Sequence, residues 1–426
     1  MSGSSESAPW QVVLSESEGA SVCYTHQKLD CQEAVSEFLA AATRNSTVVI
    51  PGKPGRIPPE SPATALVYAD VSLLKAVREH QVADQVISVE CGIEIAELNA
   101  MLALKGQWWP VLPPFPGATL FDVINSGAGG ALEQKFGGPR ELVLGGSVSL
   151  ATGESIKCGG KVVKNVSGYD MTKLFIGAHG SLGLMTMAHL RLYALPESKA
   201  TVCFGADDFD ELMQICRRLL SSGFSFSSLE LLDARAIFSE QGQKSGCLEA
   251  LVQPLGMAGG RKYWLLLAAH GLPSVVDEVI NACVSQAALV STRIDNSVQD
   301  EVWAQLSAFS CLADDSRVEI ACCPISQHKL LAALLQGSNP PYWQARPGRG
   351  RLSLFPCGQT TKEALIEQLR QFARGQSQSF SIAYSNQRFN YQVERLPESD
   401  APSDQLKRRL KERFDPGGIL NPFVSL

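Results

Sequence analysis

Three glycine-rich segments in the first half of the chain carry residues suited to holding a phosphate-containing ligand. The first follows a strand-like run at residues 48–50 and consists of Pro51, Gly52, Lys53, Pro54, Gly55 and Arg56. Backbone N–H groups in such a turn can bind phosphate oxygens. Lys53 and Arg56 can add charge-assisted hydrogen bonds. The same residues also suit an ordinary surface turn, so this loop alone does not decide between the two.

The other two segments lie at residues 113–130 and 164–183. Their candidate ligand-binding residues are Pro116, Gly117, Ala118, Thr119, Asn125, Ser126, Gly127, Asn165, Gly168, Tyr169, Asp170, Gly177, Gly180, Ser181, Leu182 and Gly183. Glycine tolerates positive φ and lets another group approach the backbone closely. We therefore interpret the last three glycines as close-approach positions, with a sharp strand bend as the alternative.

Several of these polar residues allow two interpretations. Asn165 and Tyr169 could contact a bound ring system, or Tyr169 could fill the core while Asp170 caps a short helix. Arg140, in FGGPREL, either neutralises a phosphate or faces water. Trp108 and Trp109 suit the core better than a stacking role.

Common catalytic signatures are absent from the sequence. There is no G-x-G-x-x-G after a strand, no P-loop, no H-E-x-x-H, no EF-hand loop and no G-x-S-x-G. The 12 cysteines form no C-x-x-C pair, so iron–sulfur and structural zinc sites are not indicated and no metal ligands are assigned. Reduced thiols in a reducing compartment are expected.

Charge and hydropathy narrow the class of protein further. The net charge of -6 argues against a general nucleic-acid binder. The polar start of the chain lacks the features of a secretory signal, and no run of about 20 apolar residues suggests a membrane span. We expect a soluble, cytoplasmic protein and leave peripheral membrane attachment through a partner open.

Periodicity predicts the elements that must position these loops. In the first half, helices are expected at residues 33–42 and 94–104, and strands at 48–50, 65–68, 86–89, 142–150, 160–163 and 182–193. After Pro196, helices are expected at 207–222, 273–287, 325–335 and 361–374, and strands at 229–232, 263–269, 318–322 and 352–355. Residues 339–351 are expected to form a turn in which Arg346, Arg349 and Arg351 meet solvent, an acidic substrate or a partner.

The end of the chain predicts one more helix. Ser403 can cap it, and Leu406, Leu410 and Phe414 share one face. Lys411 and its basic neighbours lie near the C-terminal end, where the helix dipole favours positive charge.

Four segments, in this order, resemble the FAD-binding vanillyl-alcohol-oxidase/p-cresol-methylhydroxylase (PCMH) family. They are ISVECGIEIAELNAML, PFPGATLFDVI, GGKVVKNVSGYDMTKLFIGAHGSLGLMT and RFDPGGILNP. The resemblance implies an α+β fold: a disordered tail (1–9), a two-part FAD-binding domain of the PCMH type (10–196), an α+β cap domain (197–384) and a C-terminal segment that returns to the FAD domain (385–426). It also implies FAD as the cofactor and Asn421 as a further contact.

Within this family, the string KNVSGYD is most similar to the FAD-binding accessory (E-type) subunit of glycolate oxidase. That similarity implies oxidation of glycolate to glyoxylate, with a larger FAD subunit and an iron–sulfur subunit as partners. PGKPGR replaces the family's GGGT-like loop, and Phe423 and Val424 replace the usual Gly-Arg after LNP.

Two alternatives remain open at this point. A stand-alone FAD-dependent 2-hydroxy-acid or alcohol dehydrogenase is one, and a flavin-free scaffold subunit is the other. The family's hydroxy-acid dehydrogenases resemble one another in a histidine cluster in the cap, whereas this cap has only His270 and His328. The chain is therefore expected to support or relay the chemistry of a complex, and its own catalytic residues are not assigned.

Overall fold

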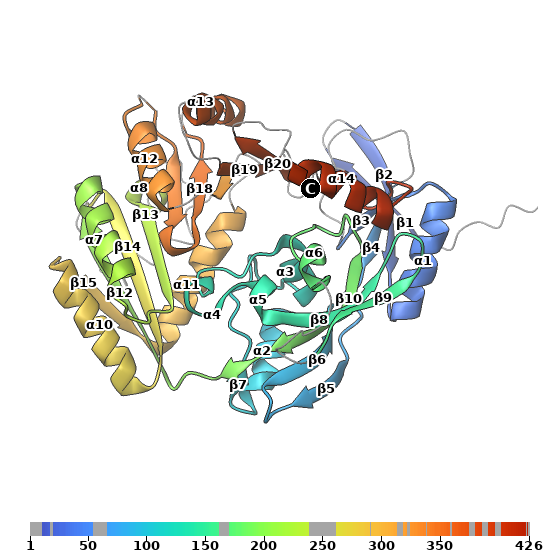
Figure 1. Cartoon of the computed structure of the whole chain (residues 1–426), viewed down its shortest axis with the longest axis horizontal. Helices are drawn as coiled ribbons and strands as arrows, with labels where there is room; N and C mark the ends of the chain where they lie inside the picture. Colours follow the sequence, from blue (N-terminus) through green and yellow to red (C-terminus); the bar gives the residue numbers. More distant parts are fainter. Residues whose placement is uncertain are drawn as a thin grey trace, which may run out of the picture.

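The computed structural model describes most of the chain as two lobes (Figure 1). The residues described are 11–17, 20–53, 66–161, 170–237, 261–289, 291–312, 318–321, 324–337, 339–357, 360–374, 380–385, 391–396, 402–422 and 424. We call residues 11–194 together with 402–424 the N-terminal lobe, and residues 198–396 the cap lobe. The expected disordered tail, residues 1–9, lies outside the described residues.

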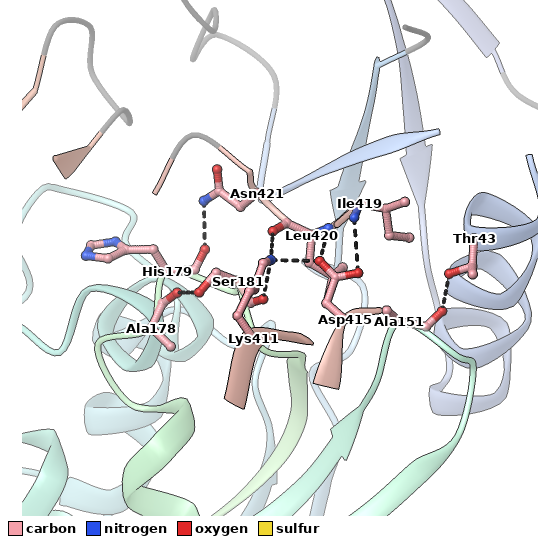
Figure 2. Close-up of polar contacts among 10 residues, drawn as sticks. All are labelled: Thr43, Ala151, Ala178, His179, Ser181, Lys411, Asp415, Ile419, Leu420 and Asn421. Carbon is pink, nitrogen blue, oxygen red and sulfur yellow. Dashed lines mark hydrogen bonds and ion pairs between the residues drawn. The ribbon is translucent and has the colours of Figure 1, made fainter. Parts of the chain in front are cut away.

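The N-terminal lobe begins with a mixed sheet in the strand order β1-β2-β4-β3. Its strands are β1 (Gln11–Ser17), β2 (Ala20–Lys28), β3 (Val48–Pro51) and β4 (Leu66–Asp70). Helix α1 (Gln32–Arg44) buries Val35, Phe38 and Leu39, the i, i+3, i+4 pattern of an amphipathic helix. The Thr43 hydroxyl of α1 donates to the Ala151 carbonyl oxygen at 2.5 Å, which ties this sheet to the next one (Figure 2).

The second sheet of this lobe is antiparallel, in the order β5-β6-β10-β8-β9. Its strands are β5 (Val77–Gln81), β6 (Val86–Glu90), β8 (Val143–Ser149), β9 (Ser155–Gly159) and β10 (Leu184–Arg191). The lobe also contains α2 (Ile95–Ala103), α3 (Leu120–Ser126), α4 (Glu133–Phe136), α5 (Pro139–Leu142), α6 (Thr172–Phe175) and the pair β7 (Gln107–Trp108) and β11 (Tyr193–Ala194).

The cap lobe is built on one large antiparallel sheet in the order β15-β12-β14-β13-β17-β18-β16-β19-β20. The strands are β12 (Ser198–Ala206), β13 (Ser228–Asp233), β14 (Tyr263–Gly271), β15 (Ser291–Asp295), β16 (Val318–Ala321), β17 (Tyr342–Arg346), β18 (Arg351–Phe355), β19 (Phe380–Ser385) and β20 (Tyr391–Leu396). The helices are α7 (Phe209–Ser221), α8 (Ala234–Ile237), α10 (Pro273–Ala287), α11 (Asn296–Leu312), α12 (Pro324–Leu335), α13 (Lys362–Arg374) and the 3-10 turn η1 (Pro347–Arg349).

The chain then returns to the N-terminal lobe through α14 (Pro402–Phe414), drawn in red in Figure 1. Leu420 forms a parallel bridge with Val49 of β3, and Asn421 N–H donates to the Val49 carbonyl at 2.9 Å. Phe414, Ile419 and Leu420 are buried in the same core as α1 and α3. The C-terminal segment is therefore part of the N-terminal lobe.

Three expectations about elements need correction. A strand was expected at 160–163, but β9 ends at Gly159, which has a φ of 62°, and residues 160 and 161 are not part of a strand; residues 162 and 163 lie outside the described residues. The cap was expected to end at 384, but β20 pairs with β19 and extends the sheet to Leu396. Residues 339–351 were expected to be a turn, yet Tyr342–Arg346 is a strand, because Trp343 and Ala345 bury their side chains in the core.

Candidate cofactor site

The first and third glycine-rich segments meet at Pro51 and Gly180. Gly180 has a φ of 71°, and a Cβ built on it would lie 2.3 Å from Pro51 Cγ. Gly52, which follows Pro51, also has positive φ and donates to the Ala69 carbonyl at 2.9 Å, while Lys53 is exposed. The lack of a side chain at Gly180 is thus what allows these two loops to touch. Pro54, Gly55 and Arg56 lie outside the described residues.

Helix α3 carries the second segment to the same place. Thr119 caps the helix: its backbone N–H donates to Asp122 Oδ2 at 2.9 Å, and its Oγ1 accepts from Asp122 N at 3.2 Å. At the other end, Gly127 has a φ of 68°, and a Cβ there would lie 3.1 Å from Gly177 Cα. His179 N–H donates to the Asn125 carbonyl at 2.9 Å. The second and third segments are therefore held together backbone to backbone.

The C-terminal segment supplies a further contact, shown in Figure 2. Asn421 Nδ2 donates to the His179 carbonyl at 2.8 Å, and the Lys411 ammonium donates to the Ser181 carbonyl at 2.7 Å. The segments singled out in the sequence thus converge on residues 177–181.

His179 occupies the centre of this arrangement with a φ of 49°, which is uncommon for a residue other than glycine. Burial lowers the pKa of its imidazole to about 4, and the carboxylate of Glu319 on cap strand β16 opposes this shift. In Figure 2 the ring points away from the Lys411–Asp415 cluster. The imidazole is therefore neutral at pH 7.

Other predicted residues have structural contacts that the sequence left open. The Ser181 hydroxyl donates to the Ala178 carbonyl at 2.6 Å, and Leu182 lies in the core. Asp170 Oδ1 accepts from Thr172 N–H at 3.1 Å at the start of α6, which matches the capping interpretation.

Some of the remaining predicted residues lie at these loops, and others lie outside the residues that the structure describes. Arg140 Nη1 donates to the Ile176 carbonyl at 3.4 Å, beside Gly177. Pro116 and Gly117 are exposed, Ala118 accepts from Ile95 N–H, and the Ser126 hydroxyl donates back into α3. Gly183 packs against β8, where a Cβ would lie 2.7 Å from Val148 Cγ1. Asn165, Gly168 and Tyr169 lie outside the described residues.

The cap contacts the second segment through a pair of charges. Glu133 Oε1 accepts from Gly129 N–H at 2.7 Å, and its Oε2 lies 3.4 Å from Arg349 Nε on η1. Arg346 Nε lies 2.6 Å from Glu230 Oε1. Of the three arginines for which solvent, an acidic substrate or a partner was expected, Arg346 and Arg349 form ion pairs within the chain, and Arg351 is exposed.

The two cap histidines lie in separate environments. His270 stacks on Trp108 of the N-terminal lobe with ring centroids 5.7 Å apart, and burial lowers the pKa of its imidazole to about 3. His328 Nε2 lies 2.9 Å from Asp210 Oδ1 on α7. No group of three or more histidine, cysteine or acidic side chains within the described residues could hold a metal ion.

Sequence reasoning missed the residues that link the segments to one another. His179 lies within the third glycine-rich segment and Glu133 follows the second by three residues, but both were passed over in favour of glycines. Lys411 was expected only as one of several positive charges near a helix end. The spacing of Lys411 and Asp415, one helical turn apart, was the available signal.

The residues present fit a dinucleotide with a diphosphate. Gly52, Gly117 and Gly127 all have positive φ, and a Cβ on Gly117 would meet nothing within 4 Å. Such turns can hold backbone N–H groups on one side, although the N–H groups of Gly52 and Gly127 themselves donate to the Ala69 and Val123 carbonyls. Lys53 supplies a cation beside the first bend. None of the helices in the described part of the chain has the length and hydropathy needed to cross a membrane.

Comparison with known proteins agrees with this geometry. Residues 28–159 match the family model of the FAD binding domain, and residues 195–316 match that of the C-terminal domain of FAD linked oxidases. Together the two matches span more than half of the chain. Alkyldihydroxyacetonephosphate synthase shares the fold, with a TM-score of 0.65 and 16% identity over 93% of this chain and 76% of that one.

Relatives along the sequence are oxidoreductases. An uncharacterised FAD-linked oxidoreductase of Mycobacterium tuberculosis is 26% identical over 92% of this chain and 88% of that protein. The mitochondrial D-lactate dehydrogenase [cytochrome] of Arabidopsis thaliana is 33% identical over 39% of this chain and 29% of its own length. The glycolate oxidase subunit GlcE of Escherichia coli is 28% identical over 41% of this chain and 50% of its own length.

The predicted fold class, FAD cofactor and enzyme class are thereby confirmed. The chain belongs to the PCMH-type FAD-linked oxidase family and is an FAD-linked oxidoreductase.

Proposed function

We propose that this chain is the FAD-binding subunit of a glycolate-oxidase-type complex that oxidises a small 2-hydroxy acid, with glycolate as the expected substrate. The similarity to GlcE supports the subunit role. The observation that carries the proposal is the separation of His270 and His328. Each imidazole contacts different residues, His270 stacking on Trp108 and His328 pairing with Asp210, so the two share no partner in these contacts.

The converging loops supply the binding part of the function. In this proposal Pro51, Gly52, Lys53, Gly117, Thr119, Asn125, Gly127, Gly177, Gly180 and Asn421 line the FAD site. Lys53 would offset part of the diphosphate charge, and N–H groups of these turns that are not already bonded would donate to its oxygens. Arg140, next to Gly177, could contribute further positive charge.

FAD, when bound, would supply the redox chemistry by accepting the two electrons that the hydroxy acid loses together with two protons. The chain's own part is to fix the cofactor loops relative to the cap through Glu133 and Arg349. The sequence contains no C-x-x-C pair that would suggest an iron–sulfur cluster. Electrons would therefore leave through an iron–sulfur partner subunit.

A second candidate is a stand-alone FAD-dependent 2-hydroxy-acid dehydrogenase. The 33% identity to a D-lactate dehydrogenase favours it, as does the nearly full-length match to the mycobacterial oxidoreductase. In that case the isolated chain must contain every residue needed for turnover. The two candidates therefore differ in what the purified chain does alone.

The test compares the isolated chain with a tagged chain purified from its own cells together with its partners. Flavin and iron are quantified in each, and dye reduction is followed with glycolate, D-lactate and D-2-hydroxyglutarate. We expect FAD in both preparations, but iron and glycolate-dependent dye reduction only in the assembled one. Turnover of a hydroxy acid by the isolated chain would favour the second candidate, and protein without flavin would overturn both.

A further inference from the structure

The end of helix α14 is linked to the cofactor loops by one ion pair, in which Asp415 is buried and Lys411 is partly buried. The Lys411 ammonium donates to the Ser181 carbonyl at 2.7 Å, to the Leu420 carbonyl at 2.6 Å and to Asp415 Oδ2 at 2.7 Å (Figure 2). An ammonium group has three N–H donors, so these contacts use its full capacity. Lys411 and Ser181 are 230 residues apart in the sequence.

Asp415 is the fixed part of this pair. Its side chain is fully buried and accepts from the backbone N–H groups of Ile419 at 3.0 Å and Leu420 at 2.8 Å. The carboxylate thus shapes the turn after α14 whether or not Lys411 is present. Lys411 adds a hydrogen bond from this turn to the Ser181 carbonyl in the third glycine-rich segment.

Both carbonyls that Lys411 holds adjoin predicted cofactor residues. Ser181 follows Gly180, whose close packing on Pro51 joins the third segment to the first. Leu420 precedes Asn421 and pairs with Val49 of β3, just before Pro51. One side chain therefore fixes the relative position of the first loop, the third loop and the C-terminal segment.

The Lys411–Asp415 pair differs from a surface ion pair because its carboxylate is fully buried. Burial lowers the pKa of the Lys411 ammonium, whereas its hydrogen bond to Asp415 raises it. Removing Lys411 would leave a buried carboxylate without its cation and two carbonyls without their donor. Breaking a buried ion pair from one side is strongly destabilising for the groups left behind.

We propose that Lys411 is a positioning residue for FAD, because it holds the Ser181 and Leu420 carbonyls and so sets the spacing of the loops that contact the cofactor. The inference rests on the proposed placement of FAD at these loops. It assigns no role to Lys411 in substrate chemistry.

The test measures FAD binding directly on the full-length protein. Lys411→Met is compared with wild type, with Lys411→Arg, which keeps the charge, and with Arg409→Met, which removes an exposed charge from the same helix. Each protein is stripped of flavin and titrated with FAD, with flavin fluorescence, visible circular dichroism and the melting temperature of the apoprotein as readouts.

We expect Lys411→Met to weaken FAD binding by about tenfold or more, which corresponds to about 1.4 kcal/mol. The flavin that it binds should have an altered dichroism spectrum. Lys411→Arg should recover part of the affinity, and Arg409→Met should match wild type. If Lys411→Met does not fold, Lys411→Gln replaces it, since this substitution removes the charge but leaves the Asp415 carboxylate and its two backbone hydrogen bonds in place.

Two results would overturn the inference. In one, Lys411→Met or its replacement melts at a lower temperature but binds FAD with unchanged affinity and spectrum. The ion pair would then stabilise the fold without positioning FAD. In the other, wild-type protein takes up no FAD, which would also remove the proposed function. Wild-type protein that binds FAD but never supports hydroxy-acid oxidation would count against the proposed function alone.

Discussion

At Gly180, the absence of a side chain decides whether two loops can meet. A Cβ there would lie 2.3 Å from Pro51 Cγ and 3.0 Å from Pro51 Cβ, and φ is 71°. We expect Gly180→Ala to displace the first loop and to weaken FAD binding by about tenfold or more, since overpacking of this kind costs about 1–3 kcal/mol. Titration of the apoprotein with FAD measures the effect.

Gly106→Ala is the matched control for Gly180→Ala. Gly106 has a φ of 66°, but a Cβ there would meet nothing within 4 Å. The control carries the same backbone strain without the collision, so its FAD affinity should stay at the wild-type value. Equal losses in the two variants would show that strain alone, and not the contact with Pro51, explains the effect.

Single residues differ in how far the sequence indicates their contacts. Gly180 could be identified because glycine has few reasons to recur at short spacing within an apolar segment. Lys411 was harder to identify, because a lysine in the last turn of a helix suits the helix dipole equally well when it is exposed, and its spacing to Asp415 indicates only an ion pair within the same turn. What turns Lys411 inward is the Ser181 carbonyl, and nothing local in the sequence indicates that partner.

At the scale of elements, helix α3 connects the second segment to the third. Its capping box joins Thr119 and Asp122, and the helix ends at Gly127 beside Gly177. Losing the Thr119 side chain should cost about 1 kcal/mol, as for other N-cap residues. We expect Thr119→Ala to lower the melting temperature of the N-terminal lobe by about 2–4 °C and to weaken FAD binding.

Calorimetry of the apoprotein gives the change in melting temperature, and FAD titration gives the affinity. Thr119→Ser keeps the hydroxyl that accepts from Asp122 N–H, so it should behave like wild type. A Thr119→Ala protein with unchanged melting temperature would mean that α3 is held by packing of Leu120 and Phe121 alone.

Helices and strands whose apolar residues recur at regular spacing could be predicted from the sequence, and strands without such spacing could not. Helix α10 (Pro273–Ala287) has the predicted bounds, because its apolar residues recur at helical spacing and a proline opens it. Strand β12 (Ser198–Ala206) was missed. It lies between β14 and β15 with a nearly continuous buried stretch, so its sequence shows no alternation.

At the scale of the whole molecule, resemblance identified the two-part FAD domain, the cap and the returning C-terminal segment. It did not identify the junction between the lobes. Contacts such as Lys135 Nζ to the His270 carbonyl at 2.9 Å join residues far apart in the sequence. Neither residue has a spacing that would reveal the other, so such contacts emerge only from the folded chain.

His270 gives this junction a dependence on pH. Trp303 Nε1 donates to Thr201 Oγ1 at 2.8 Å, and the Thr201 hydroxyl donates to Gln299 Oε1 at 2.9 Å. Gln299 Nε2, a donor, then lies 3.2 Å from His270 Nε2. This order of donors requires His270 Nε2 to accept a hydrogen bond. A proton at that nitrogen would therefore remove the last hydrogen bond of the series. Burial, with Lys199 and Lys135 nearby, lowers the pKa of His270 to about 3.

A histidine with a lowered pKa makes the folded protein sensitive to acid. Between about pH 6.5 and about pH 3 the unfolded chain binds a proton at His270 that the folded chain does not, so stability falls as the pH is lowered through this window. The slope is about 1.4 kcal/mol per pH unit. Between about pH 6.5 and pH 5, the free energy of unfolding of the wild-type protein should therefore fall by about 2 kcal/mol through His270. The His270→Gln protein should not show this part of the decrease, because glutamine does not titrate.

The measurement is the free energy of unfolding of both proteins at several pH values between 7 and 4. Because His270→Gln also removes the stacking on Trp108, its stability at pH 7 will differ, and the comparison concerns only the slopes. Trp108→Phe is the control, since it weakens the stacking but leaves His270 able to titrate, and it should keep the wild-type slope. Parallel curves for wild type and His270→Gln would show that carboxylates elsewhere, and not the lobe junction, govern the response to acid.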